Sequence, residues 1–376
     1  MMKPNVGLYV HIPFCRKKCL YCDFCSFAGT DETLRAAYTD ALCREIASYR
    51  DALRDYRIDT IYFGGGTPSC LAPAETARIL DQIAAVAEIA PDAEVTSEVN
   101  PATADEGLLC DWRAMGFNRV SIGVQSFSDA ELSALGRLHT AFEAETFVRA
   151  AFRAGFQNVG LDLMYGIPHE SPASFRETLE RAISLSPTHI SAYSLQIEEG
   201  TPFFEEKDRL VLPTDEENAD LYDLCRETLG RAGYEQYEIS NYAKPGYASK
   251  HNLRYWRLSP YIGVGVSAYS YFEGVRYGHS RSLAEYMQDD FSCRPAGETE
   301  TAESREYETV MLGLRLREGI DDAAFARAFG VTFTEKYGEK MAPYVRHGLA
   351  YHTGHGMALT PAGMYVSLGI LSEILE

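Results

Sequence analysis

A repeated alternation of short apolar runs with helical segments constrains the fold of this chain more than any other feature. Residues 1–200 contain six runs rich in β-branched and aromatic residues: 6–12, 59–65, 94–100, 119–125, 159–165 and 189–195. The segments between them carry apolar residues at helical spacing, as in 33–50, 73–89 and 172–186. Strands that alternate with helices form a parallel sheet. Because six units are too few for an eight-unit barrel, the pattern predicts a partial barrel that is open on one side.

The alternation ends near residue 200, and the rest of the chain has a different character. Residues 201–280 contain one helical segment and a stretch rich in glycine, aromatic and turn residues, which predicts a barrel extension and a connecting segment. Over residues 281–376 we expect a smaller α+β domain with helices near 301–315 and 321–329. A Gly-turned hairpin at 349–359 and a terminal helix complete a winged-helix-like outline.

The charge of the chain excludes several classes of partner. Lys and Arg number 35 and Asp and Glu number 54, a formal charge of −19 that repels phosphate backbones and acidic membrane surfaces. Residues 301–376 hold 7 basic and 10 acidic residues, a net charge of −3, so this unit is not expected to read DNA. The chain lacks the ~18 consecutive apolar residues of a spanning helix and the pattern of a signal peptide. We therefore expect a soluble, cytoplasmic protein without nucleic-acid partners.

Polar residues follow the predicted strands at the points where the strands end. In parallel α/β folds, functional groups gather at these carboxyl ends. The sequence GGGTP at 64–68 follows the second strand, Glu98 ends the third, Gln125 ends the fourth, and Asp162 lies in the fifth. Three consecutive glycines let a backbone approach a ligand closely. The pattern predicts one site at the mouth of the barrel.

Four of the nine cysteines lie within eleven positions of the loop after the first strand: Cys15, Cys19, Cys22 and Cys25. The other five are scattered singly and are expected to be small core residues: Cys43, Cys70, Cys110, Cys225 and Cys293. An odd number of cysteines in such a chain argues against a disulfide framework. Close thiolates on one loop suit zinc or an iron–sulfur cluster. Zinc usually draws on two separated ligand pairs, and no second pair follows nearby.

Three thiolates on a tight loop fit a cubane cluster in which three irons are held by Cys15, Cys19 and Cys22. The fourth iron could then bind a small molecule through nitrogen and oxygen. Cys25 could in principle occupy that fourth position. We expect it instead to turn away from the cluster, because the later strand ends would otherwise line a pocket with nothing to bind.

The cysteine loop and the glycine-rich loop together carry a family resemblance. Cys-x3-Cys-x2-Cys after one strand, with GGGTP after the next, resembles the radical SAM superfamily. In that family the fourth iron chelates S-adenosylmethionine (SAM), whose reductive cleavage gives a 5′-deoxyadenosyl radical. The motifs YVHIPFC, CDF, GGGTP, VSIGVQSF, LGRLH and DLMYGIP are similar to the oxygen-independent coproporphyrinogen III oxidase-like group over essentially the whole chain. The resemblance implies an α/β fold with a partial (βα)6 barrel, a [4Fe–4S] cluster and SAM.

Carried over by motif, the resemblance assigns nine residues to the SAM site: Tyr9, Tyr21, Gly65, Gly66, Thr67, Glu98, Gln125, Arg137 and Asp162. Glu98, Gln125 and Asp162 suit ribose hydroxyls and the amino group as acceptors. Arg137 suits the carboxylate, because a guanidinium matches its geometry.

Two branches of this group differ in their motifs. The dehydrogenase branch has an extended N-terminus and a Cys-x-Cys ending to its cysteine motif, whereas this chain has fourteen residues before Cys15 and has Phe24 in the motif. The sequence HNLRYW resembles the His-Asn-x-x-Tyr-Trp motif of the heme chaperone branch, in which heme is bound and passed to respiratory proteins. The resemblance implies His251 as a ligand of heme iron, with Tyr255 and Trp256 stacking on the porphyrin.

Several functions remain open at this stage. The favoured one is a heme chaperone of radical SAM type, with heme as cargo and a heme-accepting protein as partner. The alternative is a coproporphyrinogen III dehydrogenase, so whether the protein is an enzyme stays open. Weaker alternatives are a radical SAM enzyme that opens or methylates heme and a zinc-stabilised structural module. His347, His352 and His355 are not expected to bind a metal, since the last two fall near a hairpin turn.

Overall fold

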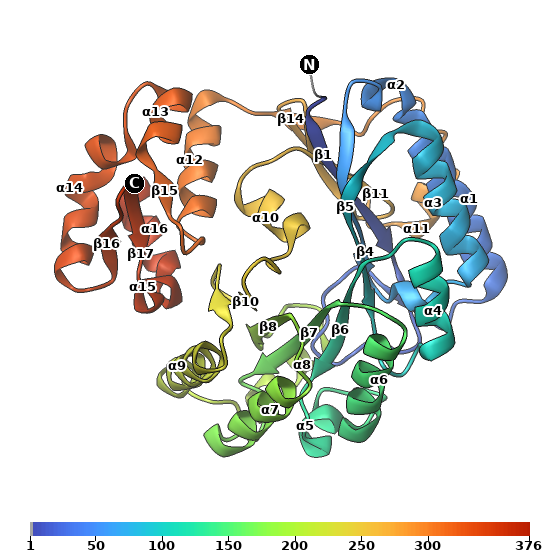
Figure 1. Cartoon of the computed structure of the whole chain (residues 1–376), viewed down its shortest axis with the longest axis horizontal. Coiled ribbons are helices and arrows are strands. Elements are labelled where there is room, and N and C mark those ends of the chain that lie inside the picture. The colour runs from blue at the N-terminus through green and yellow to red at the C-terminus, as the bar shows by residue number, and fades with distance from the viewer. Residues whose placement is uncertain (1–2) are drawn as a thin grey trace.

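The partial barrel that the alternation predicts is present in the structure. A computed structural model describes residues 3–376. Six parallel strands lie side by side in chain order: β1 (Asn5–Ile12), β4 (Arg57–Gly65), β5 (Glu88–Val99), β6 (Arg119–Gln125), β7 (Asn158–Tyr165) and β8 (His189–Ser194). Together they curve around a lumen that opens toward the C-terminal part of the chain (Figure 1). The predicted fold class is therefore confirmed.

Helices cover the outer face of the curved sheet. They are α1 (Glu32–Ser48), α3 (Pro73–Val86), α4 (Glu106–Ala114), α6 (Ala141–Arg153) and α7 (Pro172–Ser184), with the short α2 (Arg50–Leu53) and α5 (Asp129–Ala134). Local sequence signals start several of them. In α6, the Thr140 hydroxyl accepts the Glu143 backbone N–H at 3.3 Å, and the Glu143 carboxylate accepts the Thr140 N–H at 2.7 Å. This capping box satisfies two backbone donors that a helix start would leave unpaired.

Strand β6 shows how the barrel separates its two faces. Side chains of successive strand residues point to opposite faces of a sheet. Val120, Ile122 and Val124 are fully buried in the main hydrophobic cluster. Ser121 and Gln125 belong to the alternate set and line a cavity in the lumen. The outer face is therefore apolar, and the lumen is polar.

The sheet continues beyond both ends of the barrel to twelve strands. Strand β11 (Tyr261–Val264) pairs in parallel with β1, and three antiparallel strands follow: β12 (Tyr269–Phe272), β13 (Val275–Gly278) and β14 (Gly297–Thr299). At the other end β10 (Asn241–Ala243) pairs with β8 and with β9 (Glu235–Gln236). Between β8 and β9 run α8 (Pro202–Glu205) and α9 (Asp215–Arg231).

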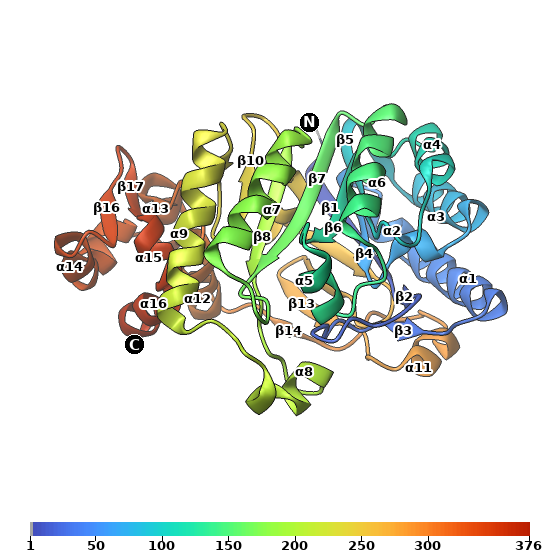
Figure 2. The same cartoon turned by 90° about the horizontal axis from the view of Figure 1, so that it is seen from below.

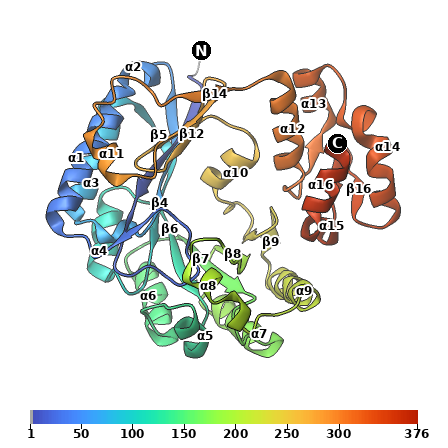
Figure 3. The same cartoon turned by 180° about the vertical axis from the view of Figure 1, so that it is seen from behind.

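The HNLRYW sequence forms a short helix, α10 (Lys250–Trp256), within the open arc of the barrel (Figure 3). The carboxylate of Glu94 on β5 accepts the backbone N–H groups of Lys250 and His251, at 3.2 and 3.1 Å. An anion at a helix N-terminus satisfies exposed donors and complements the helix dipole. Arg254 forms an ion pair with Asp59 on β4. These buried polar contacts fix α10 against the inner face of the sheet.

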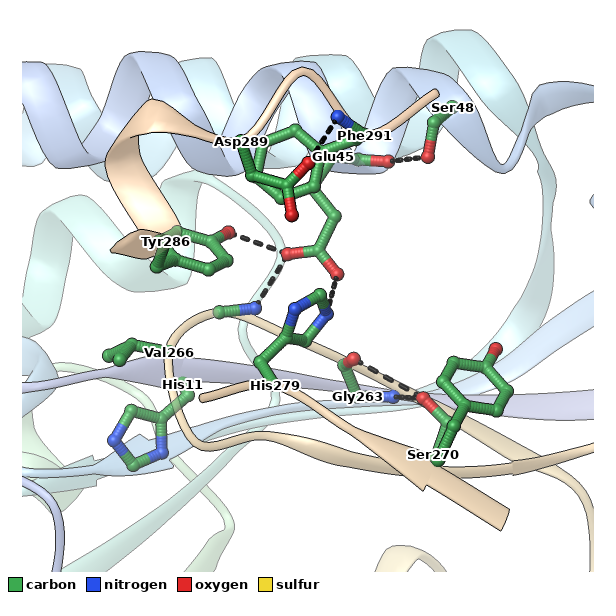
Figure 4. A network of polar contacts seen from close by, with 12 residues as sticks. His11, Glu45, Ser48, Gly263, Val266, Ser270, His279, Tyr286, Asp289 and Phe291 are labelled. Atoms are coloured by element: carbon green, nitrogen blue, oxygen red, sulfur yellow. Dashed lines mark hydrogen bonds and ion pairs between the residues drawn. The ribbon is translucent and has the colours of Figure 1, made fainter. Parts of the chain in front are cut away.

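A second buried network joins the sheet extension to the barrel (Figure 4). Glu45 of α1 accepts hydrogen bonds from the Gly265 backbone N–H (2.8 Å), His279 Nε2 (2.7 Å) and the Tyr286 hydroxyl (2.5 Å). Tyr286 belongs to α11 (Leu283–Gln288) and, with Phe291, packs in the main hydrophobic cluster of the barrel. The packing thus places these residues with the barrel, whereas the sequence pattern assigned everything after residue 280 to the second domain.

The C-terminal unit has its own hydrophobic cluster, which includes Val310, Phe333 and Met357. A three-stranded antiparallel sheet lies among its helices, formed by β15 (Ile320–Asp321), β16 (Ala350–His352) and β17 (Gly356–Leu359). The helices are α12 (Ala302–Gly313), α13 (Asp322–Phe329), α14 (Phe333–Arg346), α15 (Pro361–Tyr365) and α16 (Ser367–Leu375). Helix α14 was not among the predicted elements.

Within residues 3–376, no helix combines the length and the apolar character needed to cross a membrane. The longest helices, α1 and α9, have 17 residues each, and both carry charged side chains. A spanning helix needs about 20 predominantly apolar residues.

Candidate functional site

A cavity of about 330 Å³ lies in the barrel lumen and extends to the carboxyl ends of the strands. The loop after β1, which includes the short strands β2 (Phe14–Cys15) and β3 (Phe27–Ala28), forms one wall; β2, β3 and α8 lie along the same edge of the barrel (Figure 2). The cavity is lined by most of the predicted site residues: Cys15, Cys19, Tyr21, Cys22, Gly65, Gly66, Thr67, Glu98, Gln125, Arg137 and Asp162. The structure therefore gathers residues from five strand ends into one cavity.

The three cysteines of the motif approach the cavity from one loop. Cys15 Sγ lies 3.4 Å from Thr67 Oγ1, and Arg137 Nη1 lies 3.4 Å from Cys19 Sγ. Among residues 3–376, no three His, Cys, Asp or Glu side chains converge on a point where one metal ion could bind. A cubane does not need such convergence, because each cysteine binds a different iron. The donor set of three thiols on one short loop therefore fits a [4Fe–4S] cluster better than a single zinc ion.

Cys25 has a different environment from the other three cysteines of the loop. Its thiol lies 3.7 Å from the carbonyl oxygen of Arg281, and its own carbonyl accepts a hydrogen bond from His11 Nε2 at 2.9 Å. It also packs against the main hydrophobic cluster. Cys25 does not line the cavity, so the orientation seen here leaves the fourth coordination position to another ligand.

The glycine-rich loop has a backbone conformation that lets a ligand in the cavity come close to it. Gly65 has a φ of 108°, and a Cβ at this position would lie 2.4 Å from the His11 ring. Only glycine adopts this conformation readily. The Gly65 N–H bonds to Glu98 Oε2 at 3.2 Å, and the Gly66 N–H bonds to the Ile12 carbonyl at 2.9 Å. Both amides already have protein partners. The loop therefore has no side chains that would keep a ligand at a distance, but these two amides are not free to donate to it.

Two carboxyl groups line the cavity, Glu98 from β5 and Asp162 from β7. Glu98 bonds to the Tyr62 hydroxyl at 2.8 Å, and Asp162 bonds to the Ser121 hydroxyl at 3.1 Å. Burial, aided by the charge of Asp162, raises the pKa of Glu98 to about 7. Burial also raises the pKa of Asp162. Burial raises the pKa of an acid because it disfavours the charged form, and such shifts are frequent at functional sites.

Gln125 and Arg137 approach the cavity from the end of β6 and the segment after it. Gln125 has a φ of 68°, a left-handed conformation that is uncommon outside glycine and is often found at functional sites. Arg137 Nη2 donates to the Gly123 carbonyl at 2.5 Å, which holds the guanidinium beside Cys19. Its Nε has no hydrogen-bond partner among residues 3–376. Arg137 therefore retains a donor close to the cluster loop.

Tyr9 is the one residue predicted for SAM that does not line the cavity. Its hydroxyl bonds to His11 Nδ1 at 3.0 Å, and its ring stacks on Tyr62 with 6.2 Å between the centroids. Tyr62 itself lines the cavity, so Tyr9 packs behind Tyr62 and does not line the cavity. His11 connects Tyr9 to the carbonyl of Cys25, so this layer supports the cluster loop.

The three residues predicted to bind heme do not face one point. His251 is fully buried; its Nδ1 lies 2.9 Å from Thr60 Oγ1 and its Nε2 lies 2.8 Å from the Tyr255 hydroxyl. Burial lowers the pKa of His251 to about 3, so the imidazole is neutral at pH 7. Trp256 lies on the other side of the helix, where the Arg315 guanidinium is 4.3 Å from its ring. His251 and Tyr255 thus face the lumen, and Trp256 contacts the C-terminal unit.

Several cavity residues were not identified from the sequence: Lys17, Lys18, Arg119, Ser191, Tyr193 and Asn252. A signal existed for Arg119. It precedes Ser121, Gly123 and Gln125 at intervals of two in the strand, so the period of a strand places all four on one face. The lysines lie between Cys15 and Cys19 in the motif CRKKC, where their charge did not distinguish them from surface residues.

Comparisons with known proteins agree with this geometry. Residues 9–182 match the Radical SAM superfamily, and residues 301–366 match the HemN C-terminal domain. The chain is 37% identical over 340 residues to the heme chaperone HemW of Synechocystis sp., covering 87% of this chain and 81% of the relative. It is 32% identical to HemW of Lactococcus lactis, covering 100% and 98%. The solved structure of coproporphyrinogen III oxidase (HemN) from Escherichia coli has a TM-score of 0.85 at 24% identity, covering 99% of this chain and 90% of that chain.

The fold and the three-cysteine loop define a radical SAM protein, a class that uses a [4Fe–4S] cluster and SAM. Within that class the chain belongs to the family of proteins named heme chaperone HemW.

Proposed function

We propose that this protein is a heme chaperone that binds heme, together with a [4Fe–4S] cluster and SAM, and delivers the heme to an acceptor protein. The observation that carries the proposal is the position of α10. Its His251 ring stacks on Tyr62 with 5.1 Å between the centroids and 22° between the planes, and Tyr62 bonds to Glu98 in the cavity wall. The helix that carries the heme-chaperone motif is thus joined to the cavity of the radical SAM fold.

In this proposal Cys15, Cys19 and Cys22 hold three irons of the cluster, and the fourth iron and the cavity hold SAM. When bound, the cluster and SAM supply one-electron chemistry of the radical SAM type. The residues of the chain bind and orient: Arg137 meets the SAM carboxylate, and Glu98 and Asp162 accept hydrogen bonds from its hydroxyl or amino groups. Gly65 and Gly66 allow the close approach.

His251 binds the heme iron through one ring nitrogen. Because both nitrogens are engaged in the heme-free protein, ligation requires the bond to Tyr255 or to Thr60 to break. The pKa of about 3 keeps the imidazole neutral, which is the form that ligates iron.

The test is a heme titration of the anaerobically reconstituted full chain, with a coproporphyrinogen III assay on the same sample. We expect stoichiometric heme binding, no protoporphyrinogen formation, and about four irons and four sulfides per chain. The variant His251→Ala should lose the spectrum of a histidine-ligated heme, whereas the exposed His347→Ala should keep it. Protoporphyrinogen formation would support the dehydrogenase alternative, and stoichiometric zinc would contradict the whole proposal. Unchanged heme affinity in His251→Ala would remove His251 from it.

A further inference from the structure

Arg119 differs from Arg254, the other buried cation of the barrel among residues 3–376, in having no partner for its charge. It is the first residue of β6, lies 1% exposed to solvent, and lines the cavity in the lumen. Its Nε has no hydrogen-bond partner, and no carboxylate within residues 3–376 lies within 4.0 Å of its guanidinium. By contrast, Arg254 pairs with Asp59.

The nearest carboxylates influence Arg119 but have donors of their own. The charges of Glu94 and Asp162 raise the pKa of Arg119 against the opposing effect of burial. Glu94 accepts the backbone N–H groups at the start of α10, and Asp162 accepts the Ser121 hydroxyl. A buried charge without a hydrogen-bonded partner is strongly unfavourable. The guanidinium therefore keeps an unpaired Nε donor in a side chain that lines the cavity, and an anion bound there would stabilise its charge.

The surroundings of the guanidinium hold it in place without occupying its donors. Gly160 on β7 lies beneath it, and a Cβ at Gly160 would come within 3.3 Å of Arg119 Nη2 and 3.5 Å of His189 Nδ1. His189 Nδ1 is a second buried atom without a partner among residues 3–376, since only its Nε2 is bonded, to the Tyr237 hydroxyl at 2.8 Å. Burial lowers the pKa of His189 far below its usual range, so the ring is neutral and does not compete with Arg119 for an anion.

The chemistry of the site favours a carboxylate. A guanidinium presents two parallel N–H donors that match the two oxygens of a carboxylate. The SAM carboxylate has a nearer candidate in Arg137, which touches Cys19. Arg119 stands six residues before Gln125 on the same strand, about 20 Å away at 3.3 Å per residue, and so faces the opposite end of the lumen.

The α10 helix brings the proposed heme ligand to the same end of the lumen. Asn252, which follows His251, lines the cavity together with Arg119. Arg119 is also close enough to contribute to the lowered pKa of His251. A tetrapyrrole that reaches His251 therefore brings the carboxylates of its propionate side chains within reach of Arg119.

We propose that Arg119 is the group that recognises a carboxylate of the tetrapyrrole, at the end of the barrel lumen where β6 begins. This inference rests on the proposed function and adds a ligand-recognition residue to it. Arg119 distinguishes a free propionate from an esterified one.

The test compares heme with heme dimethyl ester, which lacks the anionic carboxylates, as ligands of the cluster-reconstituted full chain. We expect the unaltered protein to bind heme about tenfold more tightly than the diester, as one charge-assisted bidentate contact implies. Arg119→Gln should abolish that preference, and Arg119→Lys should keep part of it. The exposed Arg176→Gln should retain it in full.

Each outcome is separable from a failure of the proposed function. Equal affinity of the unaltered protein for heme and its diester would overturn the inference even if Arg119→Gln did not fold. An unchanged preference in a folded Arg119→Gln protein would overturn it too. If Arg119→Gln loses the SAM-induced change in the cluster spectrum but still prefers heme over the diester, Arg119 binds the SAM carboxylate and not the tetrapyrrole. No heme binding by the unaltered protein would contradict the proposed function itself.

Discussion

Two buried charged side chains of this protein, Glu45 and Arg119, lie in opposite kinds of environment. Each is 1% exposed to solvent. Glu45 accepts three hydrogen bonds, from Gly265, His279 and Tyr286, and joins α1 to the sheet extension (Figure 4). Arg119 has no ion pair among residues 3–376 and borders a cavity.

The difference distinguishes a structural network from a binding site. A buried polar network whose members are all satisfied rigidifies the fold, whereas a partly satisfied one destabilises it. The Glu45 network is the first kind and joins α1 to the sheet extension beside β1. The lumen is the second kind, with the raised pKa values of Glu98 and Asp162 and the unpartnered atoms of Arg119 and Arg137. We therefore expect substitutions to act on stability at the first site and on ligands at the second.

The largest expected effect is on stability, in the variant Glu45→Ala. It leaves three buried donors without an acceptor, so the free energy of unfolding should fall by about 3 kcal/mol or more. Urea denaturation of the reconstituted protein measures this, with the exposed Glu177→Ala as control. Heme titration at low temperature should be unchanged. A normal unfolding midpoint would show that the network is not structural.

The variant Glu98→Gln should change stability in the opposite direction, because it should raise the free energy of unfolding at high pH. Since the pKa of Glu98 in the folded protein is raised from 4.5 to about 7, its contribution to stability is full below pH 4.5 and is lost as pH rises through 7. Glutamine does not ionise, so the variant should match the unaltered protein at pH 4.5 and exceed it at pH 8 by about 3 kcal/mol. Urea denaturation at both pH values measures the difference.

The same Glu98→Gln variant should respond weakly to SAM, because a neutral amide is a poorer acceptor for cationic groups. The SAM-induced change in the cluster spectrum reports this. An equal stability difference at both pH values, or a normal SAM response, would place Glu98 with Glu45 as a structural residue.

A smaller effect is expected at Tyr255→Phe. Removal of the hydroxyl frees His251 Nε2 from its 2.8 Å hydrogen bond, so heme should bind about fivefold more tightly, the equivalent of one net hydrogen bond of about 1 kcal/mol. Heme titration with the exposed Tyr307→Phe as control measures the change. Weaker heme binding would instead make the Tyr255 hydroxyl part of the heme site.

No effect on the cluster is expected from Cys25→Ser. The Cys25 thiol points to the Arg281 carbonyl, away from the cavity, so iron and sulfide content and the SAM response should match those of the unaltered protein. Loss of either would mean that Cys25 turns toward the cluster when the iron is bound.

Much of the site follows from local sequence patterns. The six barrel strands begin and end within a few residues of the predicted runs, with β5 starting six residues earlier than expected. Eleven of the twelve residues assigned by motif to the cluster and the SAM site line the cavity, and Tyr9 is the exception. Strand periodicity and strand ends are short-range features, so the sequence displays them directly.

Other features depend on residues that are remote in the chain. Helix α14 was missed because Gly338 and Pro343 interrupt its pattern, although Thr332 and Glu335 form a capping box at its start. The placement of α11 with the barrel depends on contacts of Tyr286 with Glu45, 241 residues away. No local sequence pattern predicts a contact between residues so far apart in the chain.

The sequence alone determined the βα order, the cysteine loop and the glycine-rich loop, because spacing along the chain controls periodicity, turns and the clustering of thiols. Only the tertiary structure decided that Tyr9 stands behind the cavity wall, that both nitrogens of His251 are engaged, and that Glu45 is satisfied while Arg119 is not. Whether a buried charge has a partner depends on side chains brought together from distant strands. That property separates the structural network from the proposed binding site.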